Sequence, residues 1–210
     1  MLEHFQKDYH PIVESKTINL DDEEVQINQE ISIVKDILCY LNKVIDVMND
    51  KKALYGTPDS YTPDMMAIKA YTKCGLLYNS YHGMSDEKRL RSLYDIGAYN
   101  IILIEYFDGA VWNDINYIGA KYISTINHLY QSKRNTYNRN YKTEDNLTPE
   151  EITSLILMKA IRIKNILRNT HEYRKAKEAL IDNAKDILAF CYVLYNKIKN
   201  KKQDDWYMSI

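Results

Sequence analysis

Residues 95–99, Asp-Ile-Gly-Ala-Tyr, recur in altered form at residues 186–190 as Asp-Ile-Leu-Ala-Phe. A second match lies upstream of each stretch, where Ile-Lys-Ala at residues 68–70 corresponds to Met-Lys-Ala at residues 158–160. Matches that recur in the same order indicate an internal duplication. We therefore expect two diverged copies of one unit in this chain of 210 residues.

Two further features repeat in the same order. A Thr-Pro-acid sequence occurs at residues 62–64 and again at residues 148–150. Thr is a favourable N-cap, Pro suits the first helical position, and an acidic residue complements the helix dipole. Further upstream, Lys-x-x-Tyr-Gly at residues 52–56 faces Arg-x-x-Tyr-Asn at residues 134–138. Each copy should therefore place a helix, a loop and a capped second helix in the same order.

Apolar residues recur at three- and four-residue steps through most of the chain, which is typical of amphipathic helices. Only 6 Gly and 4 Pro are present, too few to punctuate a many-stranded sheet. We expect an all-α, MazG-like bundle of two pseudo-symmetric three-helix repeats, with helices at about 25–51, 63–79, 86–107, 114–137, 149–168 and 172–199. The domains expected are an N-terminal arm (1–24), repeat 1 (25–110), repeat 2 (111–200, packed with repeat 1) and a C-terminal tail (201–210).

Composition and charge exclude several classes of protein. The formal net charge is −1, so no overall field attracts nucleic acid or a membrane, and specific nucleic-acid binding is not expected. No signal peptide or membrane-length apolar run is visible. The three cysteines are widely spaced, which predicts reduced, buried thiols in a cytoplasmic protein. The 19 tyrosines suit either an interface or a wet surface, which leaves a homodimer open.

The repeated signature resembles a known family. A Tyr-Gly loop, a helix with Ile-Lys-Ala and a helix with Asp-Ile-x-x-Tyr together resemble the nucleotide-modification-associated domain of phage and bacterial proteins. That family is similar to the all-helical nucleoside triphosphate pyrophosphohydrolases of the MazG type. The resemblance covers residues 45–110 and 125–198. It implies a nucleotide or nucleoside triphosphate as ligand and Mg²⁺ as cofactor.

The resemblance also implies site residues. The family's Tyr, Lys and Asp fall on Tyr55, Lys69 and Asp95 in the first copy, and on Tyr137, Lys159 and Asp186 in the second. Asp182 and Arg162, each one turn from these positions, add a carboxylate and a positive charge to the second copy. The expected roles are catalysis for Asp95 and Asp186, magnesium binding for Asp95, Asp182 and Asp186, and substrate binding for Tyr55, Lys69, Tyr137, Lys159 and Arg162.

Two departures bear on the chemistry. The family usually has Asp before Tyr-Gly, where this chain has Leu54 and Thr136. The second carboxylate motif of the MazG-type enzymes is Glu-x-x-Asp, but Ser92 and Asn183 stand in the Glu positions. A magnesium-dependent hydrolase needs several hard oxygen ligands around the metal. The acidic set predicted from the family is therefore depleted in both copies.

Alternative interpretations stay open for these residues. Asp95 and Asp186 could instead be buried hydrogen-bond acceptors that hold a neighbouring helix. Lys69 and Lys159 could contact phosphate, pair with the Asp of their own copy, or be surface lysines with buried stems. The leading hypothesis is a nucleotide-binding protein, either a pyrophosphohydrolase or a nucleotide-modification accessory factor. The competing hypothesis is a non-catalytic binding or assembly module encoded by a phage or mobile element.

Overall fold

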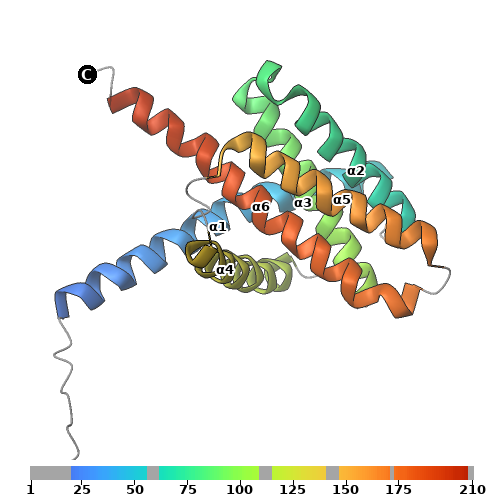
Figure 1. The fold of residues 1–210 in the computed structure, drawn as a ribbon, viewed down its shortest axis with the longest axis horizontal. Coiled ribbons are helices and arrows are strands. Elements are labelled where there is room, and N and C mark those ends of the chain that lie inside the picture. The colour runs from blue at the N-terminus through green and yellow to red at the C-terminus, as the bar shows by residue number, and fades with distance from the viewer. Residues whose placement is uncertain (1–19, 56–61, 109–114, 141–146, 171–172, 208–210) are drawn as a thin grey trace, which may run out of the picture. The chain divides into compact units, whose positions relative to one another are not determined.

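A computed structural model describes residues 20–55, 62–108, 115–140, 147–170 and 173–207, and side-chain surroundings for most of these (Figure 1). The described residues form helices joined by short turns, with no strand among them, which confirms the all-α part of the predicted fold. The elements are α1 (Leu20–Tyr55), α2 (Pro63–Ser80), the 3₁₀ helix η2 (Tyr81–Gly83), α3 (Asp86–Asp108), α4 (Ile115–Asn140), α5 (Pro149–Asn169) and α6 (Tyr173–Tyr207).

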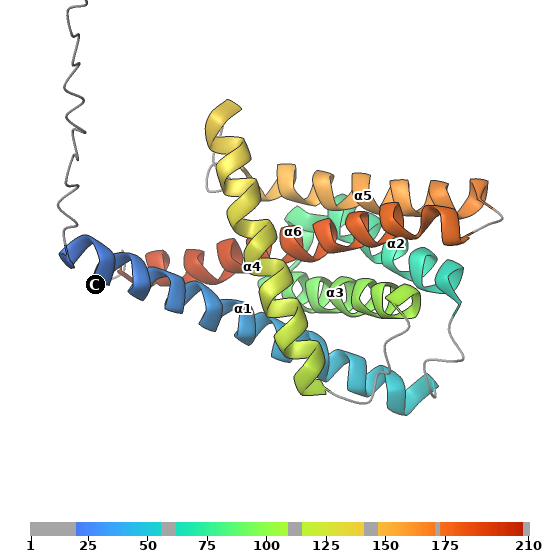
Figure 2. The same cartoon turned by 90° about the horizontal axis from the view of Figure 1, so that it is seen from below.

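The chain divides into two units, residues 1–32 and residues 33–210, and the division falls within α1. In the second unit α2 packs on α3 and α5, and α6 packs on α3, α4 and α5. Figure 2 shows α3, α5 and α6 running alongside one another while α4 crosses them. The repeated sequence stretches lie on α2 and α3 in the first half and on α5 and α6 in the second.

The core of this unit is rich in tyrosine. Tyr40, Tyr122 and Tyr192 are fully buried, and the ring of Tyr40 lies 5.4 Å from that of Tyr195. Gly97 lets α1 approach α3 closely, because a Cβ at this position would lie 2.7 Å from the Tyr40 hydroxyl oxygen. Further along α1, Lys51 reaches Asp95 of α3.

The helix starts follow the expected chemistry. The Thr62 hydroxyl accepts a hydrogen bond from the backbone N–H of Met65, and Pro63 begins α2. At α5 the predicted capping box is complete, because Thr148 and Glu151 bond reciprocally to each other's backbone N–H. Both Thr-Pro-acid predictions are thus confirmed.

Other expectations differ from the structure. α1 begins at Leu20 and α6 continues to Tyr207, so both run beyond the expected ends. Cys74 and Cys191 are buried free thiols as predicted, but Cys39 is exposed. The prediction for Cys39 is wrong because the residue lies on the side of α1 away from the buried Ile37 and Leu41. None of the described helices combines the length and apolar character that crossing a membrane requires.

Candidate functional site

Asp95 is a nearly buried carboxylate that two lysines from different helices approach. Its side chain is 12% exposed. Lys51 of α1 places its Nζ 2.9 Å from Asp95 Oδ1, and Lys73 of α2 places its Nζ 2.8 Å from Asp95 Oδ2. Each carboxylate oxygen therefore accepts a charged hydrogen bond, and α3 is tied to α1 and to α2 at one point.

The charges in this group stabilise one another. Burial raises the pKa of the Asp95 carboxyl, but the hydrogen bonds from Lys73 and Lys51 outweigh it and hold that pKa below its usual range. Burial lowers the pKa of Lys51, whereas its hydrogen bonds to Asp95 and Tyr99 raise it, with a net upward shift. Asp95 and Lys51 are therefore both charged at neutral pH.

Tyr99 lies one turn after Asp95 on α3 and contacts both Lys51 and a third lysine, Lys69. Its hydroxyl accepts a hydrogen bond of 3.0 Å from Lys51, whose Nζ is also 4.5 Å from the ring centroid. Lys69 of α2 places its Nζ 6.0 Å from the centre of the same ring, at the outer limit of a cation–π contact. We call Lys51, Lys69 and Lys73, together with Asp95 and Tyr99, the lysine cluster.

The second half of the chain has a corresponding ion pair. Asp186 of α6 forms an ion pair of 2.5 Å with Lys159 of α5, and both side chains are largely buried. Phe190, in the position that corresponds to Tyr99, is buried and has no hydroxyl group. Among the described contacts, Asp95 pairs with Lys51 and Lys73, and Asp186 pairs with Lys159. The corresponding sites differ at the next turn, where Tyr99 has a hydroxyl group and Phe190 has none.

The residues predicted from the sequence are placed as follows. The pairing of Lys159 with the Asp of its own copy is observed, but the α2 lysine that pairs with Asp95 is Lys73, one turn beyond Lys69. Asp182 and Arg162 are exposed. The side chains of Tyr55 and Tyr137 lie outside the described residues. Among side chains that the structure describes, no three or more His, Cys, Asp or Glu residues gather closely enough to hold a metal ion.

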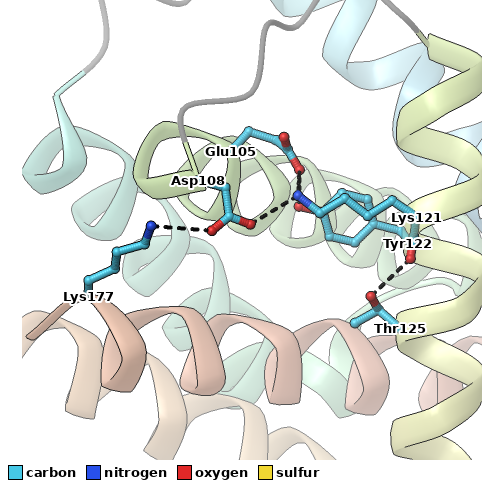
Figure 3. Close-up of polar contacts among 6 residues, drawn as sticks. All are labelled: Glu105, Asp108, Lys121, Tyr122, Thr125 and Lys177. Atoms are coloured by element: carbon cyan, nitrogen blue, oxygen red, sulfur yellow. Dashed lines mark hydrogen bonds and ion pairs between the residues drawn. The ribbon is translucent and has the colours of Figure 1, made fainter.

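A second polar cluster joins α3, α4 and α6 and was not identified from the sequence (Figure 3). Glu105 is 1% exposed, and its Oε1 accepts hydrogen bonds from Lys121 Nζ at 2.7 Å and from the Tyr122 hydroxyl at 2.6 Å. Lys121 also lies 3.0 Å from Asp108, which Lys177 approaches to 3.7 Å. The sequence signal for this cluster was a glutamate, Glu105, within the apolar run of α3. Its partners Lys121 and Tyr122 lie on the next helix, so the sequence pattern alone did not pair them with Glu105.

The chemistry of this second cluster is self-contained. Burial lowers the pKa of Lys121, but the hydrogen bonds to Glu105 and Asp108 raise that pKa by more than burial lowers it. The net shift of the Lys121 pKa is therefore upward. Two carboxylates and two lysines balance in formal charge. This second polar cluster is therefore suited to holding α4 against α3. The described residues of the lysine cluster, in contrast, include three positive groups and one negative group.

Comparisons with known proteins give no relative from which the role of the candidate site could be inferred. No family model matches the chain, and neither a curated protein nor a solved structure is similar to it.

Proposed function

We propose that the chain binds a nucleotide through its phosphate groups, and that the lysine cluster is the binding site. One observation carries the proposal: Lys51 and Lys73 both pair with the carboxylate of Asp95, and Lys69 lies beside the ring of Tyr99, one turn further along α3. The described members of the cluster therefore have a formal charge of about +2 when all are ionised. A phosphate group supplies the negative charge that would balance it.

Access to the cluster also supports a ligand from solvent. The Lys73 side chain is 36% exposed, and Lys69 is half-buried, so both side chains are partly accessible to solvent. The side chains of Lys51 and Asp95 are less exposed than that of Lys73, and their ion pair fixes the position of the Asp95 carboxylate. Ammonium groups are compact donors that bind phosphate as point charges. Lys69 and Lys73 are thus assigned to phosphate contact and Lys51 to positioning Asp95 and Tyr99.

We also propose that the fold is a duplicated, MazG-like bundle. Its supporting contacts occur in corresponding pairs: α2 packs on α3 as α5 packs on α6, and α2 packs on α5 as α3 packs on α6. α1 contacts both α3 and α6 through Tyr40. α4 likewise contacts α3 through Tyr122 and α6 through Tyr130.

Magnesium does not fit the lysine cluster as its residues are arranged. Both oxygens of Asp95 already accept hydrogen bonds from ammonium groups, and Asp186 Oδ2 is paired with Lys159. A metal at either Asp would have to displace a lysine and work against its positive charge. The proposed function is therefore nucleotide binding through lysines, and magnesium-dependent hydrolysis stays a prediction from the sequence alone.

The proposal is tested by thermal unfolding with adenosine triphosphate, thymidine triphosphate, inorganic triphosphate and the two nucleosides, each with EDTA and with Mg²⁺. A ligand at a hundred times its dissociation constant stabilises the folded state by about 2.7 kcal/mol, which raises Tm by several degrees. We expect the triphosphates to raise Tm with EDTA present and the nucleosides to leave it unchanged. Absence of any shift with every phosphate compound would contradict the proposal.

Two variants locate the binding. Lys69→Gln removes a cluster charge without touching the ion pairs of Asp95 and should reduce the shift. Lys164→Gln is the matched control, because Lys164 of α5 lies 3.9 Å from the ring of Tyr71, another lysine-on-tyrosine contact outside the cluster. The control should respond to triphosphates as the unmodified protein does. Equal loss in both variants would mean that general positive charge, not the lysine cluster, attracts the phosphate.

A further inference from the structure

The bodies of α2 and α5 contain basic residues but no acidic ones, although the whole chain is nearly neutral. Residues 65–80 and 152–169 include four Lys and two Arg and no Asp or Glu. The acidic residues of the two helices, Asp64, Glu150 and Glu151, all lie in the first turns. The formal net charge of −1 therefore includes a local excess of positive charge along this pair of helices.

The part of this charge that reaches solvent comes mainly from α5. Lys73 of α2 and Lys159 of α5 pair with carboxylates of α3 and α6. Arg162 and Arg168 are exposed, and Lys164 is half-buried. These three residues leave positive charge on the side of α5 that the core does not cover.

Apolar side chains are exposed beside these positive charges. On α2, Met65 is 37%, Ile68 56% and Leu76 48% exposed, and on α5, Met158 is 46% and Ile161 38% exposed. Each set lies on the side of its helix that faces away from the buried residues of that helix. We use the name α2–α5 face for the surface formed by Met65, Ile68, Leu76, Met158, Ile161, Arg162, Lys164 and Arg168.

The two helices of this face lie side by side and antiparallel (Figure 1). His82, in the turn after α2, places its Nε2 3.5 Å from Oε1 of Glu150 at the start of α5. Further along, Lys164 Nζ of α5 lies 3.9 Å from the ring centroid of Tyr71 of α2. The exposed apolar residues of the two helices therefore adjoin and form one surface. A contiguous exposed apolar surface marks an interaction site.

The chemistry of the face selects its partner. Its positive charge attracts an anionic partner and repels the same face of a second copy. Single-stranded nucleic acid binds through aromatic stacking, and the apolar residues of the face are all Met, Ile or Leu. They are distributed along both helices from Met65 to Leu76 and from Met158 to Ile161, which suits a fluid surface without a fixed shape. Basic residues beside inserted aliphatic side chains bind anionic lipid headgroups. We propose that the α2–α5 face binds the surface of a membrane that contains anionic lipids.

Cosedimentation of the full chain with lipid vesicles tests the proposal. Vesicles of phosphatidylcholine mixed with phosphatidylserine are compared with vesicles of phosphatidylcholine alone, each at low and at high salt. We expect binding to the phosphatidylserine vesicles only, and release at high salt because salt screens the charges. Equal binding to both vesicles, or binding to neither, would overturn the proposal. Binding of polyglutamate without binding of vesicles would identify an acidic protein as the partner and would equally overturn it.

Two exposed positions locate the contact, and each has a matched control. Ile161→Gln removes an inserting aliphatic side chain and should weaken vesicle binding roughly tenfold, whereas Leu38→Gln on α1, where Leu38 is 41% exposed, should not. Arg168→Gln should weaken vesicle binding about fivefold, and Arg91→Gln, at an exposed arginine of α3, should leave it unchanged. Circular dichroism checks that all four variants are folded. Vesicle binding that Ile161→Gln and Arg168→Gln leave unchanged, or that the controls reduce equally, would overturn the proposal.

Discussion

The ammonium group of Lys73 lies 2.8 Å from Oδ2 of Asp95, and this contact joins α2 to α3. The other oxygen of the same carboxylate is bonded to Lys51 of α1. Asp95 thus connects three helices, and Lys69 adds a further positive charge beside it at Tyr99. Stability and the proposed ligand binding are therefore linked at this residue.

Asp95→Asn should destabilise the protein by about 2 kcal/mol, because two partly buried lysines lose the anion that satisfies them. Urea unfolding followed by circular dichroism measures the change. Asp46→Asn is the control, since Asp46 pairs with Lys43 at 3.5 Å on the exposed side of α1 and should contribute less than about 1 kcal/mol. Equal effects of the two substitutions would show that the Asp95 pairs contribute no more than a surface contact.

The contribution of Asp95 should also depend on pH. Its pKa is lowered in the folded protein, so the unfolded chain binds a proton first as the pH falls. The stabilisation is therefore complete above the unfolded pKa, about 3.9, and is lost as the pH falls through the lower folded pKa. The stability difference between the unmodified protein and Asp95→Asn should stay constant from neutral pH to about pH 5 and shrink below about pH 4. A difference that grew in acid would contradict this sign.

Gly97→Ala should destabilise the protein by about 1–3 kcal/mol, although Ala favours helix formation over Gly. The added Cβ would lie 2.7 Å from the hydroxyl oxygen of Tyr40 and 3.0 Å from a methyl carbon of Val44, and both residues are fully buried. Gly75→Ala and Gly119→Ala are matched controls within α2 and α4, where a Cβ meets nothing within 4 Å. Thermal unfolding should show both controls slightly stabilised, and stabilisation of Gly97→Ala would refute the close approach of α1 to α3.

Lys121→Met should cost about 3 kcal/mol, because Glu105 would remain buried without its cationic partner. Tyr122→Phe should cost about 1–2 kcal/mol, since it removes one hydrogen bond to the same carboxylate oxygen. Lys177→Met, whose ammonium group lies 3.7 Å from Asp108, is the control and should change stability by less than about 1 kcal/mol. Chemical unfolding of the three variants should give this order, and a larger loss for Lys177→Met would contradict the assignment.

Local sequence rules predicted the helices well because their signals lie within each helix. The Thr-Pro-acid starts at residues 62–64 and 148–150 are short-range chemistry, and both produced the expected caps. Periodicity likewise marks the buried face of α6, on which Leu180, Ile187 and Leu194 are fully buried.

Local sequence rules could not predict which lysines pair with the buried carboxylates. Lys69 matched Lys159 in the sequence, yet packing turns α2 so that Lys73 bonds to Asp95. Lys51 and Lys121 reach their carboxylates from helices far along the chain, and their contacts depend on how α1 and α4 cross α3. Periodicity identifies the apolar stripe of α1 but not what covers it, since Ile27 and Ile31 are exposed and Ile37 and Leu41 are buried.

The central claim is that the lysine cluster binds the phosphates of a nucleotide, and isothermal titration calorimetry tests it most directly. Adenosine triphosphate is titrated in EDTA into the unmodified protein, Lys69→Gln and the control Lys164→Gln. Loss of one charge-assisted contact, about 1.5–3 kcal/mol, predicts roughly 10- to 100-fold weaker binding for Lys69→Gln and unchanged binding for the control. Absence of binding to the unmodified protein, or equal affinity in all three proteins, would contradict the account.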